Sequence, residues 1–296
     1  MKKTIRIGSR DSKLAVIQAE LVREQIKKAA PEYEVELITM KTTGDMILDR
    51  SLDAIGGKGL FVKELDRALL DGRVDLTVHS LKDMPMETNP ELPILAYSKR
   101  EDPRDALIFH PEKACFPEDG LVGTSSKRRA LQLKEIYPES RTCGIRGNVQ
   151  TRLRKVAEEG MDATILAAAG LKRLGMEAYI GRYFSVDEML PAAGQGILGI
   201  QGRAGEEPAW MEWLNDRDSM YAALAERQFV RVLDGGCSSP VAAHAVVSGE
   251  EIYLKGLYYR EWNDSYFLSE MTGNVKDAEK LGETLALKMQ KEAHGE

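Results

Sequence analysis

The chain has 296 residues, of which 43% are hydrophobic and 30% are charged, and its formal net charge at pH 7 is −6. This length exceeds what one hydrophobic core usually supports, so we expect two or three domains and exclude a small stapled scaffold and a mainly disordered chain. The three cysteines show no close pairing, which argues against a disulfide framework and against a four-ligand zinc site. The mild acidity argues against a general nucleic-acid-binding protein.

The N-terminal residues pass from two lysines directly into a strand-like alternation, without the apolar block of a signal peptide. The sequence also lacks a run of about 18 to 20 apolar residues, which a membrane-spanning helix requires. We therefore predict a cytoplasmic protein that does not associate with a membrane.

Strand and helix patterns alternate from the N-terminus onward. Strands are predicted at 4–9, 33–40 and 74–80, and helices at 13–30 and 60–71. The first helix has Ser12 as its N-cap and Pro31 just beyond its end. Leu14, Ile17 and Leu21 form its apolar row at helical spacing.

The glycine-rich stretch 41–59 has neither a helical nor a strand period, and we interpret it as a mobile loop. Charge and proline interrupt the pattern at 99–103, which indicates a first crossing between domains. Beyond it, strands are predicted at 105–110, 121–126 and 162–169, and helices at 127–136 and 148–159. The segment 190–196 indicates a second crossing.

The strand predicted at 196–201 is expected to return to the first sheet, so that two strands join two α/β domains as a hinge. A long helix from about 219, strands at 241–248, 251–259 and 265–272, and a helix near 275–292 indicate a smaller C-terminal α+β domain. The predicted fold class is α/β, with domains at 1–98 with 195–216, 104–190, and 219–296.

Residues 194–199 match the dinucleotide-binding pattern GxGxxG. A β-like run follows them, whereas a pyrophosphate site requires the N-terminus of a helix, so we interpret these glycines as hinge residues. The four histidines have no metal-ligand spacing with one another or with cysteine, and no metal site is predicted. His79 lies in a strand pattern and is interpreted as a core residue, with a role in the site as the alternative.

Residues 127–155 carry nine basic and two acidic side chains, a local charge of +7. One interpretation is a solvated helix face. The other is an anion site, because 123–126 follows a strand and opens a helix beside Arg128 and Arg129, where hydroxyl and N–H groups bind anions. Arg146 repeats this arrangement before the next helix, and the guanidinium fork suits carboxylate or phosphate.

Polar residues also follow the strand predicted at 74–80. Ser80, Lys82 and Asp83 lie at its carboxyl end, where open α/β sheets bind their ligands. Alternatively, Lys82 and Asp83 form only a surface ion pair.

Cys237 lies in a loop with Gly235 and Gly236, between a helix pattern and a strand pattern. The glycines make the loop flexible enough to present the Cys237 thiol to a cavity. Cys237 is therefore interpreted either as an attachment site or nucleophile, or as an inert residue. Cys115 and Cys143 lie in or beside apolar patterns and are interpreted as inert small hydrophobic residues.

Eight sequence blocks are distinctive when they are taken together. They are SRDSKLA (9–15), GGKGLFVKEL (56–65), VHSLKDMP (78–85), GTSSKRR (123–129), IRGNVQTRL (145–153), LAAAGLKRLG (166–175), LPAAGQG (190–196) and GGCSSP (235–240). Collinear from Arg10 past Cys237, they resemble the hydroxymethylbilane synthase family, also called the porphobilinogen deaminase family.

The resemblance implies three domains, the first two like the lobes of periplasmic solute-binding proteins. It also implies a dipyrromethane cofactor attached by a thioether to Cys237, and no metal. The family deaminates four porphobilinogen molecules and joins them onto this cofactor, then hydrolyses the chain to release hydroxymethylbilane for tetrapyrrole and heme biosynthesis. A monomer that binds neither nucleic acid nor membrane is implied as well.

The resemblance also assigns roles to individual residues. Asp83 would be the catalytic carboxylate, which helps the substrate lose ammonia and stabilises cationic pyrrole intermediates. The positions that match cofactor-binding residues are Ser80, Lys82, Asp83, Thr124, Ser126, Arg128, Arg129 and Arg146. Those that match substrate-binding residues are Arg10, Arg146, Arg152, Arg173 and Gln195. Arginine suits this role because every pyrrole ring of the product carries two carboxylates.

The chain departs from the family pattern at Lys127, where an apolar residue is usual, and at 238–239, where two serines replace a bulkier pair. Both departures concern loop packing. Two other functions are considered. A two-lobed protein that binds a small polyanion would have no use for Cys237 or Asp83, and a nucleic-acid-binding protein that used 127–155 would show steep salt dependence.

Overall fold

The computed structural model describes residues 4–46, 62–206, 208–233, 240–260, 262 and 265–294. The chain forms two compact units, Met1–Arg100 with Ile197–Met220 and Glu101–Gly196 with Tyr221–Glu296. The interpretation of 41–59 as a loop is wrong at its start, because Thr43–Met46 forms helix α2. The rest of that stretch lies outside the described residues.

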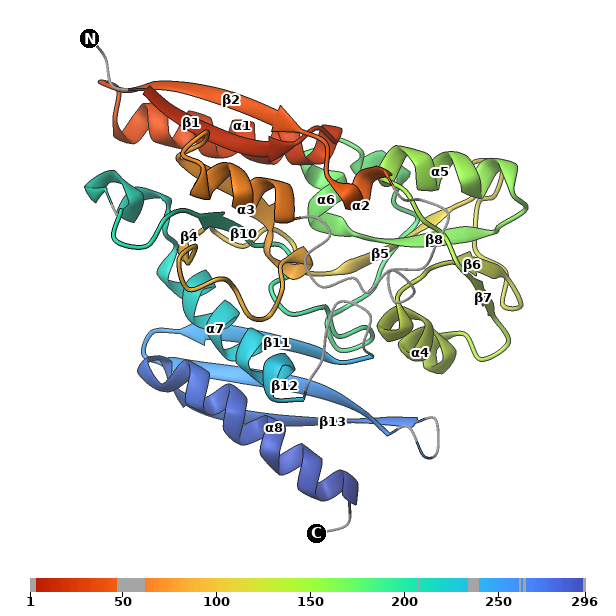
Figure 1. Ribbon diagram of the computed structural model, residues 1–296. Helices are drawn as coiled ribbons and strands as arrows, with labels where there is room; N and C mark the ends of the chain where they lie inside the picture. The colour runs from red at the N-terminus through yellow and green to blue at the C-terminus, as the bar shows by residue number, and fades with distance from the viewer. Residues whose placement is uncertain are drawn as a thin grey trace. The chain divides into compact units, whose positions relative to one another are not determined.

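The first unit contains a five-stranded sheet in the order β2-β1-β3-β10-β4 (Figure 1). Its strands are β1 (Thr4–Arg10), β2 (Glu34–Met40), β3 (Leu76–Ser80), β4 (Ile94–Tyr97) and β10 (Leu198–Gln201). β1 pairs in parallel with β2 and β3, whereas β10 runs antiparallel between β3 and β4. The predicted return of 196–201 to the first sheet is confirmed, and β4 is a strand that the sequence analysis missed.

Helix α1 (Lys13–Ala29) begins as predicted, because the hydroxyl of Ser12 accepts a hydrogen bond from the N–H of Ala15. Its buried residues are Ala15, Gln18, Ala19, Val22 and Ile26. The predicted apolar row Leu14, Ile17 and Leu21 is therefore not the core-facing one, and Leu21 is 46% exposed. Small alanines in the true row let the helix approach the sheet closely.

Helices cover both faces of this sheet, and the alternation of side chains in β1 shows which helix lies on which face. Ile5 and Ile7 pack in one cluster with Val22 of α1. Between them and the strand end, Gly8 faces Leu65 of α3 (Lys63–Leu70), where an added Cβ would lie 3.3 Å from the Leu65 Cδ2 atom. The sheet is thus packed between α1 and α3.

The second unit contains a five-stranded sheet in the order β7-β6-β8-β5-β9. Its strands are β5 (Asp105–Phe109), β6 (Leu121–Gly123), β7 (Arg141–Cys143), β8 (Ala163–Ala167) and β9 (Arg182–Tyr183). β6 pairs in parallel with β7 and β8, whereas β5 is antiparallel to β8 and β9. The strand predicted at 162–169 is wrong at its end, because helix α6 (Ala168–Arg173) begins directly after β8.

Helices lie on both faces of the second sheet as well. Leu107 of β5 packs with Leu133 of α4 (Lys127–Ile136). The neighbouring position Ile108 packs with Leu171 of α6 and Leu153 of α5 (Val149–Glu158). α4 therefore covers one face, and α5 and α6 cover the other.

A smaller antiparallel sheet follows helix α7 (Arg217–Val232). Its strands, in the order β11-β12-β13, are β11 (Ala242–Ser248), β12 (Glu251–Arg260) and β13 (Ser265–Asn274). Helix α8 (Ala278–His294) packs along β12 and β13, as Figure 1 shows. The predicted class, α/β with a smaller C-terminal α+β part, is confirmed.

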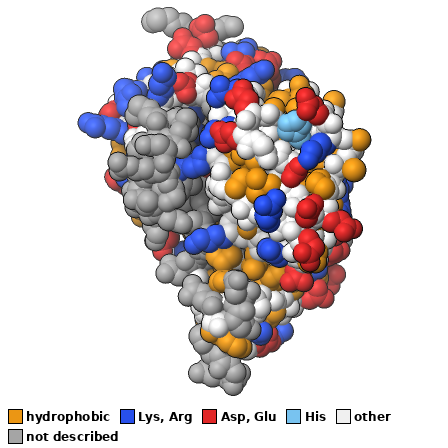
Figure 2. Space-filling view, turned by 90° about the vertical axis from the view of Figure 1, so that its right-hand side faces the viewer, with side chains coloured by type: hydrophobic (Ala, Val, Ile, Leu, Met, Phe, Trp, Pro, Cys, Tyr) orange, Lys and Arg blue, Asp and Glu red, His pale blue; other side chains and the backbone are white. Residues whose placement is uncertain are grey.

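None of the helices in the described part of the chain combines the length and hydropathy that a membrane span requires. Lysine and arginine side chains are interspersed with aspartate and glutamate on the face shown in Figure 2. This face is thus a surface of mixed charge.

Candidate active site

A pocket lies at the edge of the first sheet where β1 and β3 end. It is lined by Arg10, Ala15, Gln18, Val62, Val78, His79, Ser80 and Asp83. Because β1 and β3 are parallel, Arg10 and Ser80 at their carboxyl ends reach the same edge. Asp83 follows in the 3-10 helix Leu81–Asp83, which also carries Lys82. The pocket thus brings together three predicted site residues: a guanidinium, a hydroxyl and a carboxylate.

Backbone hydrogen bonds hold the turn that carries Asp83. The N–H of Leu81 donates to the carbonyl of Ile197 at 3.0 Å, and the N–H of Met84 donates to that of Leu81 at 3.1 Å. Leu81 and Met84 are buried, whereas Asp83 is exposed. The carboxylate of Asp83 is therefore accessible to a ligand and carried by a fixed segment.

Gln18 is a polar residue of the pocket that the sequence analysis missed. Its Nε2 atom donates to the Ser80 hydroxyl at 2.9 Å, and its side chain is buried on α1. This contact fixes the orientation of the Ser80 side chain. Gln18 lies in the row of Ala15 and Val22, which is one of two rows at helical spacing, so the sequence alone did not single it out.

His79 is buried, as its interpretation as a core residue predicts, and it also lines the pocket. Its Nε2 atom lies 2.9 Å from the hydroxyl of Thr77. Burial lowers the pKa of His79 from 6.5 to about 4, and the nearby cation Arg10 acts in the same direction. The ring is therefore neutral at physiological pH, and the pocket has no cation at this position.

We expect the ring resonances of His79 to show no protonation step above about pH 5 in an NMR titration, because its pKa is lowered to about 4. In the unfolded chain the ring binds a proton near pH 6.5. Because the folded protein binds this proton less readily than the unfolded chain, the neutral ring makes its full contribution to the free energy of unfolding above about pH 6.5. That contribution is lost as the pH falls towards 4. Between about pH 6.5 and 4, the free energy of unfolding should therefore fall less in the variant His79→Gln than in wild type. A His79 midpoint near 6.5 would contradict the assignment.

Two strand-to-helix loops of the second unit share one construction. Ser126 caps α4 by accepting from the N–H of Arg129, and Asn148 caps α5 by accepting from that of Thr151. The hydroxyl of Ser125 donates to the carbonyl of Ile145 at 2.9 Å and accepts from its N–H at 3.0 Å. The two loops therefore lie side by side, and both open a helix whose N–H groups favour anions.

Arg146 and Arg152 belong to the second of these loops. Arg146 is half-buried, and the Nε atom of Arg152 donates to the carbonyl of Gly147 at 2.9 Å. Gly147 has a φ of 117°, and an added Cβ would lie 2.5 Å from the Cγ2 atom of Thr151. Only glycine fits this conformation, so Gly147 is required for the shape of the loop whose carbonyl Arg152 contacts.

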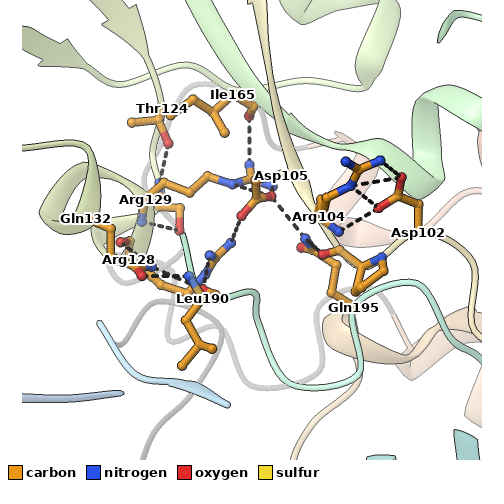
Figure 3. A network of polar contacts seen from close by, with 12 residues as sticks. Asp102, Arg104, Asp105, Thr124, Arg128, Arg129, Gln132, Ile165, Leu190 and Gln195 are labelled. Carbon is orange, nitrogen blue, oxygen red and sulfur yellow. Dashed lines mark hydrogen bonds and ion pairs between the residues drawn. The ribbon is translucent and has the colours of Figure 1, made fainter. Parts of the chain in front are cut away.

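Arg128 and Arg129 point into the protein (Figure 3) and are only 4% and 6% exposed. Their Nη2 atoms donate to the carboxylate of Asp105 at 2.8 and 2.7 Å. Their Nη1 atoms donate to the carbonyls of Leu190 and Ile165 at 2.6 and 2.8 Å. The interpretation of 127–155 as a solvated face is wrong for these two arginines. Asp105 was missed as a partner of both.

Gln195 and Arg173 bind backbone groups at the two crossings. The Nε2 atom of Gln195 donates to the carbonyl of Pro103 at 2.7 Å and to Asp105 at 3.1 Å. The Nη2 atom of Arg173 donates to the carbonyl of Gly196 at 2.6 Å. Burial lowers the pKa of Arg173 to about 10, so this guanidinium is charged at neutral pH.

The glycine pattern at 194–199 and the three cysteines are the remaining candidate motifs. Residues 194–199 lead into strand β10, which confirms that no helix follows the glycine pattern. Cys143 packs beside Ile145, and burial raises the pKa of its thiol. Cys115 is exposed, so it does not pack as the small hydrophobic residue that its sequence pattern indicated. Cys237 and the serines that follow it lie outside the described residues.

The solved structures that the chain resembles include several binding proteins. The methionine-binding protein MetQ matches with a TM-score of 0.46 at 11% identity, covering 74% of this chain and 93% of that one. The effector-binding domain of BenM with benzoate matches with a TM-score of 0.43 at 17% identity, covering 72% and 89%.

The sequence comparisons are much closer. Family models match residues 5–210, described as "Porphobilinogen deaminase, dipyromethane cofactor binding domain", and 220–291, described as the C-terminal domain. Porphobilinogen deaminase of Ruminiclostridium josui is 57% identical over 97% of this chain and 98% of its own length. That of Acetivibrio thermocellus is 53% identical over 98% and 99%. The chain belongs to the porphobilinogen deaminase family.

The chain is accordingly a transferase of tetrapyrrole biosynthesis that uses a dipyrromethane cofactor to build hydroxymethylbilane from porphobilinogen. The described residues fit this cofactor chemically. Each of its rings carries carboxylates and a pyrrole N–H, and the turn at the pocket offers Lys82 for a carboxylate and Asp83 to accept from an N–H.

Proposed function

We propose that Asp83 is the catalytic carboxylate of this deaminase and that Cys237 holds the cofactor. The observation that carries the proposal is the pocket in which Arg10, Ser80 and Asp83 meet at the carboxyl edge of the first sheet. A substrate with acidic side arms and a pyrrole N–H finds an acceptor and a cation there. The cofactor supplies the covalently anchored ring that is extended.

The remaining proposed contacts follow the same chemistry. Ser80, Lys82, Asp83, Thr124, Ser126, Arg128, Arg129 and Arg146 hold the cofactor, and Arg10, Arg146, Arg152, Arg173 and Gln195 act on the substrate. The product gains two carboxylates with every ring, so a single cationic group is not enough to bind it and several are needed. The capped starts of α4 and α5 add N–H donors of the right polarity.

Asp83 acts on the charge that develops on the substrate. When ammonia leaves the side chain of porphobilinogen, positive charge spreads over the pyrrole ring and its N–H becomes a stronger donor. A fixed carboxylate that accepts this hydrogen bond lowers the energy of the charged state. The neutral ring of His79 adds no opposing positive charge beside it.

We further propose that the chain is organised as three domains, at 1–98 with 195–216, 104–190, and 219–296. The three sheets in the described residues support this division. A cytoplasmic monomer is the expected form, and light scattering of the purified protein tests the monomer.

Intact-mass spectrometry of the purified protein, with an assay for porphobilinogen consumption, tests the proposal. We expect the mass of the chain plus two linked pyrrole units, with the added mass on the peptide that contains Cys237. Added porphobilinogen should be consumed with release of ammonia. A bare mass and a Cys237 thiol that alkylates freely, in protein that is active, would disprove the attachment.

A further inference from the structure

Asp105 lies where three separate segments of the second unit meet (Figure 3). It begins β5, directly after the first crossing. Its carboxylate accepts from Arg128 and Arg129 on α4 and from Gln195 on the second crossing. Gln132 reinforces this junction, because its amide binds both the N–H and the carbonyl of Leu190, at 2.7 and 3.1 Å.

Within the described residues, the two ion pairs of this junction share a single carboxylate. Asp105 is fully buried and supplies one negative charge to two buried guanidinium groups. Burial lowers the pKa of Arg128, the neighbouring Arg129 lowers it further, and Asp105 opposes both effects. Counted over these three side chains alone, two positive charges face one negative charge.

Three cationic residues at the start of α4 are unfavourable for the stability of this helix. The first turn of α4 carries Lys127, Arg128 and Arg129 and has no acidic residue. The partial positive charge of a helix N-terminus favours anions and disfavours cations. A bound anion would reverse this cost, and the carboxylates of the cofactor have the required charge.

Adjacent residues on a helix point about 100° apart, and two guanidinium groups repel each other. Asp105 overcomes both effects, because Arg129 binds it through Nε and Nη2 at 3.1 and 2.7 Å while Arg128 binds the second oxygen. We propose that Asp105 is a positioning residue, which holds Arg128 and Arg129 as one cationic pair for the cofactor carboxylates and ties that pair to both crossings. This inference rests on the proposed function.

The test replaces Asp105 by asparagine, which keeps the shape but removes the negative charge and replaces one acceptor oxygen by an NH2 donor that faces a guanidinium N–H group. Asp102→Asn is the matched control, because Asp102 pairs with Arg104 on the neighbouring segment and does not contact the arginines of α4 in Figure 3. We expect Asp105→Asn to lower turnover by about 10²-fold and to accumulate enzyme with a different number of added pyrrole units. The control should keep the wild-type mass distribution.

A merely structural role would lower thermal stability without changing which intermediates accumulate. Asp105→Glu, which retains the charge, should restore part of the activity. If cofactor-loaded wild type and Asp105→Asn give the same mass distribution and turnover, the inference is wrong. If wild-type protein does not carry the mass of the cofactor, the proposed function is wrong, and the inference about Asp105 fails with it.

Should Asp105→Asn fail to fold, hydrogen exchange decides the question. Wild type with its cofactor is compared with the cofactor-free variant Cys237→Ala. Peptides that cover 103–105, 128–132 and 190–195 should all exchange more slowly when the cofactor is present, because one carboxylate links them. Equal exchange in the two proteins would overturn the inference.

Discussion

Replacement of Cys237 by alanine is expected to abolish turnover, because the growing chain would have no covalent anchor. The thioether needs a sulfur nucleophile, and alanine provides none. Intact mass should equal that of the bare sequence, and porphobilinogen consumption should fall to background. Cys115→Ser is the control: this thiol is exposed, so the substitution should change neither the adduct nor the activity. A Cys237→Ala protein that still carries the pyrrole mass would disprove the anchor.

Asp83→Asn is expected to fold and keep its cofactor but to turn over slowly. The amide can still accept from the pyrrole N–H, but it supplies no negative charge to the developing cation. Loss of a preorganised electrostatic contact typically costs about 10²- to 10³-fold, and loss of proton transfer can add about 10²-fold. The effect should appear in kcat and be smaller in KM, because ground-state contacts with Arg10 and Ser80 remain.

Two variants separate charge from shape at this position. Asp83→Glu keeps the charge at a changed distance and should be less impaired than Asp83→Asn. Asp71→Asn, an exposed residue beyond the end of α3, provides a control for loss of one negative charge in the same unit and should behave as wild type. If Asp83→Glu and Asp83→Asn are equally slow, geometry and not charge dominates.

Helix starts could be predicted well from the sequence because they depend on local chemistry. Ser12 and Ser126 cap α1 and α4 through hydrogen bonds to N–H groups three residues ahead, so a short window contains the whole signal. Strand ends were predicted less accurately. β8 gives way to α6 at Ala168 within a run of alanines that fits either structure.

The buried face of α1 shows where periodicity fails. Leu21 belongs to a leucine-rich row, but Ala19 and Val22 belong to another row with the same period. Hydropathy favours the larger residues, whereas close approach to a sheet favours the smaller ones. The sequence could not decide between the rows, because the answer depends on the strands that α1 covers.

Some polar residues at the pocket could be identified from the sequence, whereas the Asp105 junction could not. Ser80, Lys82 and Asp83 could be identified because they follow one strand within a few residues. The partners of Asp105 come from residues 128, 129 and 195, which lie far away in the sequence. No local pattern links them, so a buried carboxylate that opens a hydrophobic strand gave no signal of its own.

The catalytic role of Asp83 is tested most directly by the rate at which cofactor-loaded Asp83→Asn adds its first porphobilinogen, measured in a single turnover. This measurement excludes product release and cofactor assembly, and it isolates the step that the carboxylate is proposed to accelerate. We predict a rate at least about 10²-fold below that of wild type. A rate within about threefold of wild type, which corresponds to a barrier change below ~0.7 kcal/mol, would remove Asp83 from the mechanism.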